Sequence, residues 1–240
     1  MQIIIPMAGA GSRFQNAGFE HPKPFIEFLG KTMIEHVIDN LGPTNDFIIL
    51  MQKDHYIKYN DVIKRITKNV SGFDAVLVES MTRGAAETCL LAKNKLDMNA
   101  PLMIANCDQI MDWNSYDFRA WFLASGLDGA IVTFDSQSIK NSYAEIDSNG
   151  LVCRTAEKVV ISPHATTGIY VWNHAGNFCS AAEEMIIQGL KTNNEFYVCP
   201  VYNKNIEKGD KIGIYHVKRH WPVGTPQDLV EYISYVAIDK

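Results

Sequence analysis

The stretch IIIPMAGAGSRFQNAGFEHPK, residues 3–23, holds the most informative pattern in the sequence. It begins with three consecutive isoleucines, which predict a buried strand of a parallel sheet. Residues 8–12 are alanine, glycine and serine, so backbone N–H groups there can approach an anion closely. Arg13 adds a forked cation suited to phosphate oxygens, and Lys23 adds a second positive charge. These features together predict a loop that holds a triphosphate.

The glycines alone do not decide between this site and a plain strand-to-helix turn with an exposed arginine. The spacing matches neither GxGxxG nor GxxxxGK[ST], so it supports neither a dinucleotide-binding turn nor a P-loop. The longer pattern is more specific. The segments MAGAGSRF (7–14) and HPKPFIEFLGKTMIEHVI (21–38) together resemble the signature of the sugar-phosphate nucleotidyltransferases, or nucleotide-sugar pyrophosphorylases.

This resemblance implies a Rossmann-like three-layer α/β/α fold with a mostly parallel central sheet. It also implies that Lys23 and Arg13 contact the phosphates of a nucleoside triphosphate as catalytic residues. The glycine loop would wrap the nucleotide through Ala8, Gly9, Ala10, Gly11 and Ser12.

Length and composition narrow the class of protein. A chain of 240 residues suits a single α/β domain, and a hydrophobic content of 47% is ordinary for a globular protein. The net charge of −5 argues against a nucleic-acid partner. The sequence has no apolar run long enough to span a bilayer and no leader pattern, so we expect a cytoplasmic protein without membrane insertion. The five cysteines are widely spaced, which predicts small core residues instead of disulfides or a zinc site.

Small and polar residues follow two further predicted strands, Phe47–Met51 and Ala75–Val78. Ligands of open parallel sheets bind at the carboxyl ends of the strands. Gln52 is therefore a candidate for reading the nucleotide base, although a solvated loop glutamine is an equal alternative. The turn GAAET resembles the family's turn that packs on base and ribose, which implies nucleotide contacts from Gly84 and Ala85. Close packing of helix on sheet is the alternative for this turn.

A fourth predicted strand, Pro101–Ala105, leads to Asp108. A carboxylate beyond the end of a buried strand suits Mg²⁺, which takes few protein ligands and keeps phosphates and water for the rest. The family resemblance implies that Asp108 holds the metal that bridges the triphosphate. A helix-capping aspartate is the alternative.

The second half of the sequence predicts a β-hairpin over residues 143–152, with a turn at Asn149–Gly150. A Glu–Lys pair and a Gly-Ile-Tyr strand follow, as they do in the family. The resemblance implies that Glu157 bonds sugar hydroxyls and that Lys158 holds the sugar phosphate. It also assigns Thr167 and Gly168 to the substrate site. A solvated ion pair is the alternative for Glu157 and Lys158.

The segment VGTP (223–226) matches the family's Trp-x-Asp-x-Gly-Thr-Pro motif in part. Pro222 occupies the position of the motif's second metal-binding aspartate, and proline cannot ligate Mg²⁺. Either one protein carboxylate suffices, or Asp228 or another group takes its place. The change also leaves open a protein that binds a nucleoside triphosphate without turning it over.

The resemblance covers the whole chain and implies a single nucleotidyltransferase domain, with residues 1–135 binding nucleotide and residues 136–240 binding the sugar phosphate. The expected reaction couples a nucleoside triphosphate with a sugar-1-phosphate, or another phosphomonoester, and releases pyrophosphate. Surface polysaccharide synthesis is the expected purpose. A GT-A glycosyltransferase and a non-catalytic nucleotide-binding subunit are the alternatives. The sequence names neither the base nor the acceptor, and it leaves a homo-oligomer open.

Overall fold

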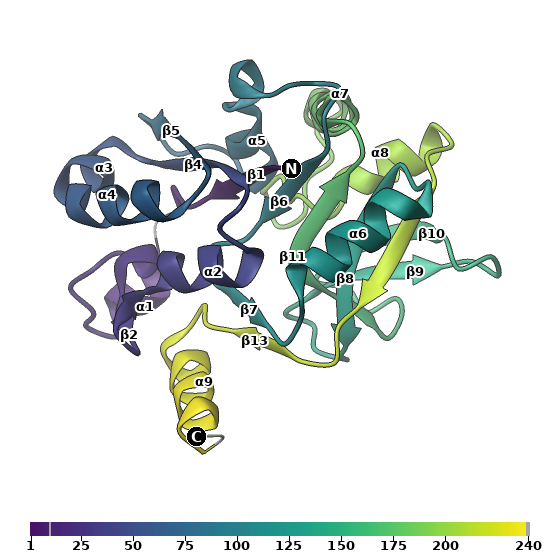
Figure 1. Cartoon of the computed structure of the whole chain (residues 1–240). Coiled ribbons are helices and arrows are strands. Elements are labelled where there is room, and N and C mark those ends of the chain that lie inside the picture. Colours follow the sequence, from purple (N-terminus) through teal and green to yellow (C-terminus); the bar gives the residue numbers. More distant parts are fainter. Residues whose placement is uncertain (10, 239–240) are drawn as a thin grey trace.

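A mixed nine-stranded sheet forms the centre of the computed structural model, which describes residues 1–9 and 11–238 (Figure 1). Strands β5, β4, β1 and β6 run parallel, and β11 joins them antiparallel beside β6. Strand β8 pairs with β11 and β12, and the hairpin of β9 and β10 completes the sheet. Its strands are β1 (Gln2–Pro6), β4 (Asp46–Gln52), β5 (Gly72–Val78), β6 (Leu102–Ala105), β8 (Gly129–Asp135), β9 (Ser142–Ile146), β10 (Val152–Glu157), β11 (His164–Trp172) and β12 (Ile212–His216).

Helices cover both faces of this sheet (Figure 1). Two small ribbons lie beside it: β2 (Glu27–Phe28) with β3 (Lys31–Thr32), and β7 (Gln109–Met111) with β13 (His220–Pro222). The helices are α1 (Ser12–Asn16), α2 (Met33–Leu41), α3 (Lys53–Lys58), α4 (Asn60–Asn69), α5 (Ala85–Leu90), α6 (Ser115–Ser125), α7 (Ala175–Ile187), α8 (Val201–Glu207) and α9 (Pro226–Ile238), with 3₁₀ turns η1 (Lys23–Phe25) and η2 (Lys93–Lys95). The three-layer α/β/α prediction with parallel central strands is confirmed.

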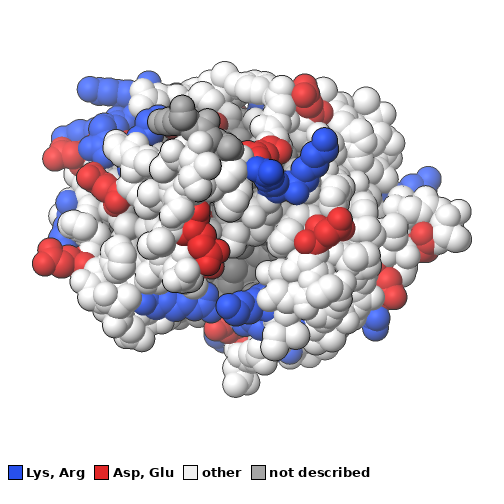
Figure 2. All heavy atoms as spheres, turned by 90° about the horizontal axis from the view of Figure 1, so that it is seen from below, with Lys and Arg blue, Asp and Glu red and all other residues white. Residues whose placement is uncertain are grey.

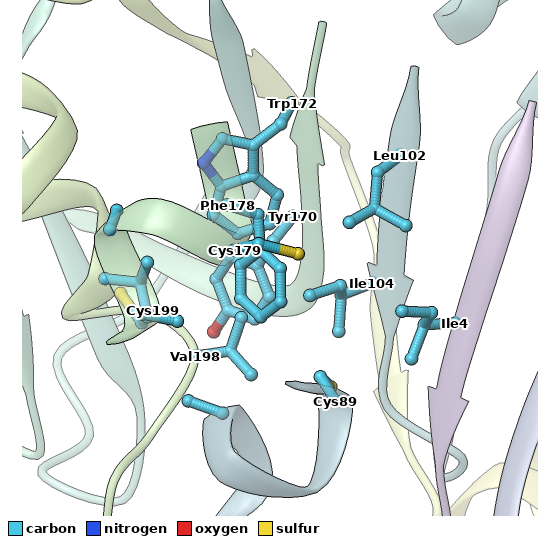
Figure 3. Close-up of a cluster of buried hydrophobic side chains, with 14 of the residues drawn as sticks. Ile4, Cys89, Leu102, Ile104, Tyr170, Trp172, Phe178, Cys179, Val198 and Cys199 are labelled. Atoms are coloured by element: carbon cyan, nitrogen blue, oxygen red, sulfur yellow. The ribbon is translucent and has the colours of Figure 1, made fainter. Parts of the chain in front are cut away.

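The alternating side chains of the strands build a core on each face. Ile4 faces the helices α5, α7 and α8, whereas its neighbours Ile3 and Ile5 face α2, α4 and α6. Figure 3 shows the first of these cores, where Ile104 points toward the rings of Tyr170 and Phe178 and Ile4 lies on the neighbouring strand β1. Both faces of the parallel strands are covered, which is why they appear in the sequence as continuous apolar runs.

Helix α2 illustrates how local sequence defines an element. Thr32 begins it with a reciprocal capping box, in which Glu35 Oε2 accepts hydrogen bonds from the backbone N–H and the hydroxyl of Thr32 at 3.0 and 2.6 Å. Gly42 ends it in the left-handed region, at φ +89°. The apolar residues between these ends face the core at helical spacing.

Two details differ from the sequence-based expectations. The spacing of apolar residues over 54–70 predicts one surface helix, but the structure has two helices there, α3 and α4, that meet at Tyr59. The ring of Tyr59 stacks on Phe25 at 4.1 Å between centroids, a tertiary contact that periodicity does not reveal. Cys153 is exposed, unlike the other four cysteines, because it points outward from β10 where the register with β9 shifts.

Helix α9 lies apart from the main sheet, beyond β13 (Figure 1). A third apolar cluster attaches it, in which Leu229 packs with Phe14, Phe28 and Val223. Across residues 1–9 and 11–238, the helices are all too short or too polar to cross a membrane.

Candidate active site

A row of hollows follows the carboxyl ends of β1, β4, β5 and β6. The outer hollow, of about 420 Å³, is lined by Ala8, Gln52, Lys53, Asp54, Val78, Glu79, Ser80 and Met81. The glycine-loop hollow, of about 490 Å³, has Ala8, Gly9, Gly11 and Ser12 on one side and residues from 81–85 and Thr88 on the other. The central hollow, of about 360 Å³, is lined by Gly11, Ser12, Arg13, Phe14, Lys23, Asp108, Glu195 and Gly224. The hairpin hollow, of about 430 Å³, lies between β9, β10 and β11 and includes Glu157 and Lys158.

These hollows share walls and therefore form one continuous cleft. Ala8 borders the outer and glycine-loop hollows, and Arg13 borders the central and hairpin hollows. Glu195 borders the glycine-loop, central and hairpin hollows. The face seen in Figure 2 carries interspersed acidic and basic side chains, which suits a small charged ligand better than a nucleic acid.

An ion pair forms the floor of the central hollow. Lys23 Nζ donates to Asp108 Oδ2 at 2.7 Å, and the two side chains are 23% and 18% exposed. Burial alone would lower the pKa of Lys23, but the neighbouring Asp108 carboxylate raises it above its ordinary value. The ammonium is therefore charged at pH 7. Segments 85 residues apart in the sequence supply the pair.

Two glycines make room for this floor. Gly11 adopts φ +63° where it begins α1, a left-handed conformation that favours glycine. A Cβ on Gly224 would lie 2.6 Å from Asp108 Oδ2, so a larger residue there would displace the carboxylate. The backbone N–H of Val223 donates to the Asp108 carbonyl at 2.9 Å, which holds the VGTP segment against the aspartate. Gly224 is thus a positioning residue for the Asp108 carboxylate. The sequence motif VGTP matched a family pattern but did not reveal this role.

Arg13 lies at the junction of two hollows. Its side chain is exposed and forms no hydrogen bond or ion pair with any residue in 1–9 or 11–238. A charged guanidinium in this position can bind an anion without first breaking an internal contact.

The nucleotide-side predictions fall on the walls of the outer and glycine-loop hollows. Gln52 lines the outer hollow, and its amide Nε2 donates to the Ala8 carbonyl at 3.0 Å. Gly84 and Ala85 line the glycine-loop hollow with Gly9, Gly11 and Ser12, whereas Ala10 lies outside the described residues. Gly84 also has a packing role, because a Cβ there would lie 2.5 Å from the backbone of Phe196. The packing alternative for the GAAET turn is therefore present in the structure, and the nucleotide contacts of Gly84 and Ala85 stay a prediction.

Glu157 and Lys158 do not pair with each other. Ser142 Oγ donates to the buried Glu157 carboxylate, and burial raises the pKa of Glu157 above its ordinary value. Lys158 has a left-handed backbone, at φ +56°, and its Nζ donates to the hydroxyl of Tyr197 at 2.6 Å. That hydrogen bond is the main cause of the raised pKa of Lys158. Both side chains line the hairpin hollow, so the solvated ion pair is not what the structure contains.

The prediction for Thr167 needs a correction. Its side chain is fully buried, and Oγ1 donates to the Val132 carbonyl at 3.2 Å, so it faces the core instead of the hollow. Its neighbours Thr166 and Gly168 line the hairpin hollow. Successive residues of a strand point to opposite faces, which explains the offset of one residue.

The structure adds polar residues to the hairpin hollow that sequence analysis did not assign. Gln109 and His220 contact each other through the amide oxygen and the ring Nε2, across the pairing of β7 with β13. Burial lowers the pKa of His220 to about 4, so this ring is neutral at pH 7. Neither residue has a local sequence signal, since the site forms only when β13 pairs with β7. Asn106 and Lys140 also line this hollow.

The donor set of the central hollow fits a hard cation in part. Asp108 supplies one carboxylate, and the Lys23 ammonium on its oxygen marks a position where positive charge is stabilised. Pro222 lines the hairpin hollow opposite Gln109 and supplies no ligand. Asp228 does not line the four hollows, whereas Glu195 borders the central one. Oxygen ligands of this kind suit Mg²⁺ together with phosphate oxygens and water.

Comparisons with known proteins agree with this geometry. A family model described as nucleotidyl transferase matches residues 2–237. Mannose-1-phosphate guanyltransferase of Schizosaccharomyces pombe is 25% identical over 240 residues, covering 96% of this chain and 62% of that protein. The mannose-1-phosphate guanylyltransferase catalytic subunit beta of Dictyostelium discoideum is 24% identical over 72% of this chain and 50% of its own length. The chain therefore spans about half to three-fifths of the length of these curated relatives.

A solved structure covers more of both chains. The nucleoside-diphosphate-sugar pyrophosphorylase from Vibrio cholerae RC9 superposes with a TM-score of 0.84 at 26% identity, over 97% of this chain and 99% of that one. The similarity therefore extends along the full sheet and the cleft at its edge.

Proposed function

This chain belongs to the nucleotidyl transferase family, and we propose that its cleft joins a nucleoside triphosphate to a sugar-1-phosphate or another phosphomonoester. An oxygen of the acceptor phosphate attacks the α-phosphorus of the triphosphate. The bond from the α-phosphorus to the bridging oxygen breaks, and pyrophosphate leaves with that electron pair. The observation that carries this proposal is the Lys23–Asp108 pair, which lies between a glycine-rich hollow and a second hollow with its own lysine.

The acceptor phosphate is already an anion, so the reaction needs no general base. Its difficulty is to bring two polyanions together and to stabilise charge as pyrophosphate departs. Arg13 and Lys23 would neutralise the triphosphate from the central hollow, and Lys158 would hold the acceptor phosphate from the hairpin hollow. In this arrangement residues 1–135 contribute most of the nucleotide side and residues 136–240 most of the acceptor side.

Glu157 would orient the acceptor. Its carboxylate is held by Ser142 and remains at the wall of the hollow, where it can accept hydrogen bonds from hydroxyl groups. Gln52 would select the base from the outer hollow, since an amide both donates and accepts. Gly84 and Ala85 would let the nucleotide approach the backbone of the glycine-loop hollow.

Asp108 is the residue that would hold Mg²⁺. Glu195 lines the same hollow and would assist through a carboxylate oxygen or through a bridging water. When bound, the ion would withdraw charge from the α-phosphate. Lys23, on the same floor, would donate to a phosphate oxygen of the triphosphate.

The first experiment measures pyrophosphate release with Mg²⁺ across CTP, UTP, dTTP, GTP and ATP. Each triphosphate is paired with sugar-1-phosphates and with other phosphomonoesters. Release that requires both substrates supports the proposal and identifies the base. Sugar transfer from a nucleotide-sugar without pyrophosphate would instead indicate a glycosyltransferase.

Pro222 supports a second candidate, a subunit that binds nucleoside triphosphate without turnover. Triphosphate binding without release from any pair would favour it. The variant Pro222→Asp then tests the cause, because a new carboxylate beside Gln109 should create turnover if a missing ligand is what prevents it. If one carboxylate already suffices, Pro222→Asp changes turnover by less than about tenfold.

A further inference from the structure

Three potential metal ligands gather at the end of strands β8, β11 and β12, and none of them lines the hollow of the Lys23–Asp108 floor. Asp135 is the last residue of β8, His164 the first of β11 and His216 the last of β12. His164 lies directly opposite Asp135 in the antiparallel pairing. His216 lies opposite Thr133, which is two residues before Asp135 and on the same face of β8. Register therefore places all three side chains on one face of three neighbouring strands.

The side chains are close enough for a shared ion. Their ligand atoms all lie within 4.8 Å of one another, and His216 Nε2 is 3.9 Å from Asp135 Oδ2. Ligands about 2.0–2.1 Å from a tetrahedral Zn²⁺ lie roughly 3.4 Å apart. A shared ion would therefore require the three side chains to rotate closer together.

One ring atom gives an independent reason to expect a ligand. His164 Nδ1 is buried and has no hydrogen-bond partner within residues 1–9 and 11–238. A buried polar atom that has lost water without gaining a partner costs free energy. A metal bond at this nitrogen would remove that cost.

We propose that Asp135, His164 and His216 bind a zinc-type divalent transition-metal ion. Two imidazoles and one carboxylate are a ligand set that Zn²⁺ prefers, whereas Mg²⁺ prefers oxygen ligands alone. The side chains of Asp135 and His216 are 76% and 43% exposed, so solvent can reach the ion and water can complete its coordination.

The site would anchor one wall of the hairpin hollow. The segment 136–141 begins directly after Asp135, and its Ser136 N–H donates to the Pro163 carbonyl at 3.1 Å, next to His164. Lys140 and Asn141, in the same segment, line the hairpin hollow. A metal that joins β8 to β11 and β12 would hold the base of this segment, and so would stabilise the acceptor side without touching the substrate.

The test uses the full chain after treatment with a chelator. Zn²⁺ is titrated by calorimetry in millimolar Mg²⁺, which occupies oxygen-ligand sites. We expect one equivalent to bind with a dissociation constant in the micromolar range or below. Asp135→Asn and His216→Gln, both at exposed positions, and His164→Gln should each weaken binding at least tenfold. His174→Gln, at an exposed histidine far from the cluster in sequence, is the matched control and should bind like the parent protein.

Two further measurements separate a built site from scattered surface histidines. Co²⁺ in place of Zn²⁺ should give the visible absorption of a protein-bound ion, and His216→Gln should abolish it. Zn²⁺ should also slow hydrogen exchange over residues 136–141 in the parent protein but not in Asp135→Asn. The proposal is wrong if no equivalent binds at 100 μM Zn²⁺, or if His216→Gln and Asp135→Asn bind as tightly as His174→Gln. Neither result depends on nucleotidyl transfer, so failure here leaves the proposed function untouched.

Discussion

Lys23 and Lys158 are both cleft lysines, but they obtain their partners in opposite ways. Lys23 meets a carboxylate from a segment 85 residues away. Lys158 has a glutamate as its immediate neighbour in sequence, yet it bonds the hydroxyl of Tyr197 instead. Lys158 has a left-handed backbone, and the carboxylate of Glu157 is buried and accepts a hydrogen bond from Ser142.

The difference concerns the charge that each region offers to a ligand. In the central hollow, Asp108 neutralises the Lys23 ammonium, so a ligand must compete with Asp108 for that ammonium. In the hairpin hollow, Lys158 is hydrogen-bonded to the neutral hydroxyl of Tyr197. The carboxylate of Glu157 lies in the same hollow, and its burial disfavours the ionised form. The Lys23–Asp108 floor is electrostatically satisfied before substrates arrive and leaves Arg13, among the described residues, as the unpaired cation of the central hollow, whereas the hairpin hollow is poised for an anion and for hydroxyl groups.

The largest expected effect comes from breaking the satisfied pair. Asp108→Asn should lower turnover by roughly 10²–10³-fold, because the loss of one group that stabilises transition-state charge typically costs that much. Lys23→Met should act similarly while leaving the aspartate free. Pyrophosphate release and circular dichroism measure activity and fold. Asp112→Asn, at an exposed acid four residues away, is the control. Near-normal turnover by Asp108→Asn would show that Asp108 has no part in the mechanism.

A change in the other region should affect the acceptor alone. Lys158→Met should raise the KM for the phosphomonoester roughly 10–100-fold, equivalent to about 1.4–2.7 kcal/mol, with little change in triphosphate binding. Lys158→Arg should recover part of the loss, since it retains the charge. The comparison between the two lysines fails if triphosphate affinity falls as much as acceptor affinity. Lys211→Met, at an exposed lysine, serves as the control.

Gly224→Ala tests the floor without removing a charge. The added Cβ would lie 2.6 Å from Asp108 Oδ2, so the carboxylate must move. We expect turnover to fall about tenfold and the free energy of unfolding to fall by about 1–3 kcal/mol. Gly9→Ala is the steric control, because a Cβ there meets no described atom within 4 Å, and its melting temperature should match the parent's. Unchanged turnover in Gly224→Ala would mean that the position of Asp108 is not critical.

The smallest effect should be a gain in stability. The pKa of Glu157 is raised in the folded state, so its ionisation destabilises the fold as the pH rises through that pKa. Glu157→Gln should therefore raise the melting temperature at pH 7–8, by up to roughly 4 °C, or about 1 kcal/mol. The gain should vanish below about pH 4, where the carboxyl is protonated in both states. Acceptor binding should weaken in the same variant, and a gain that persists at low pH would contradict the electrostatic cause.

Much of the fold followed from local pattern. The isoleucine run, the helix at Met33–Leu41 and the hairpin turn at Asn149–Gly150 are set by residues within a few positions of each other. The break at Tyr59 did not follow, because stacking on Phe25 is a contact between distant segments. The same distinction applies to the cleft. The glycine loop and Asp108 were recognisable from the sequence, whereas the contact of Gln109 with His220 depends on the pairing of β7 with β13.

By itself, the sequence determined the layered α/β class, the parallel strands and the segments that border the cleft, because apolar periodicity and small-residue turns act locally. Only the tertiary structure decided which side chains of those segments face the hollows. It turned Thr166 toward the hairpin hollow and Thr167 toward the core. It brought Glu195 to the junction of three hollows. It also gathered Asp135, His164 and His216 on one face of the sheet. Strand register and long-range packing make those choices, and a shift of one residue in register reverses the side to which a side chain points.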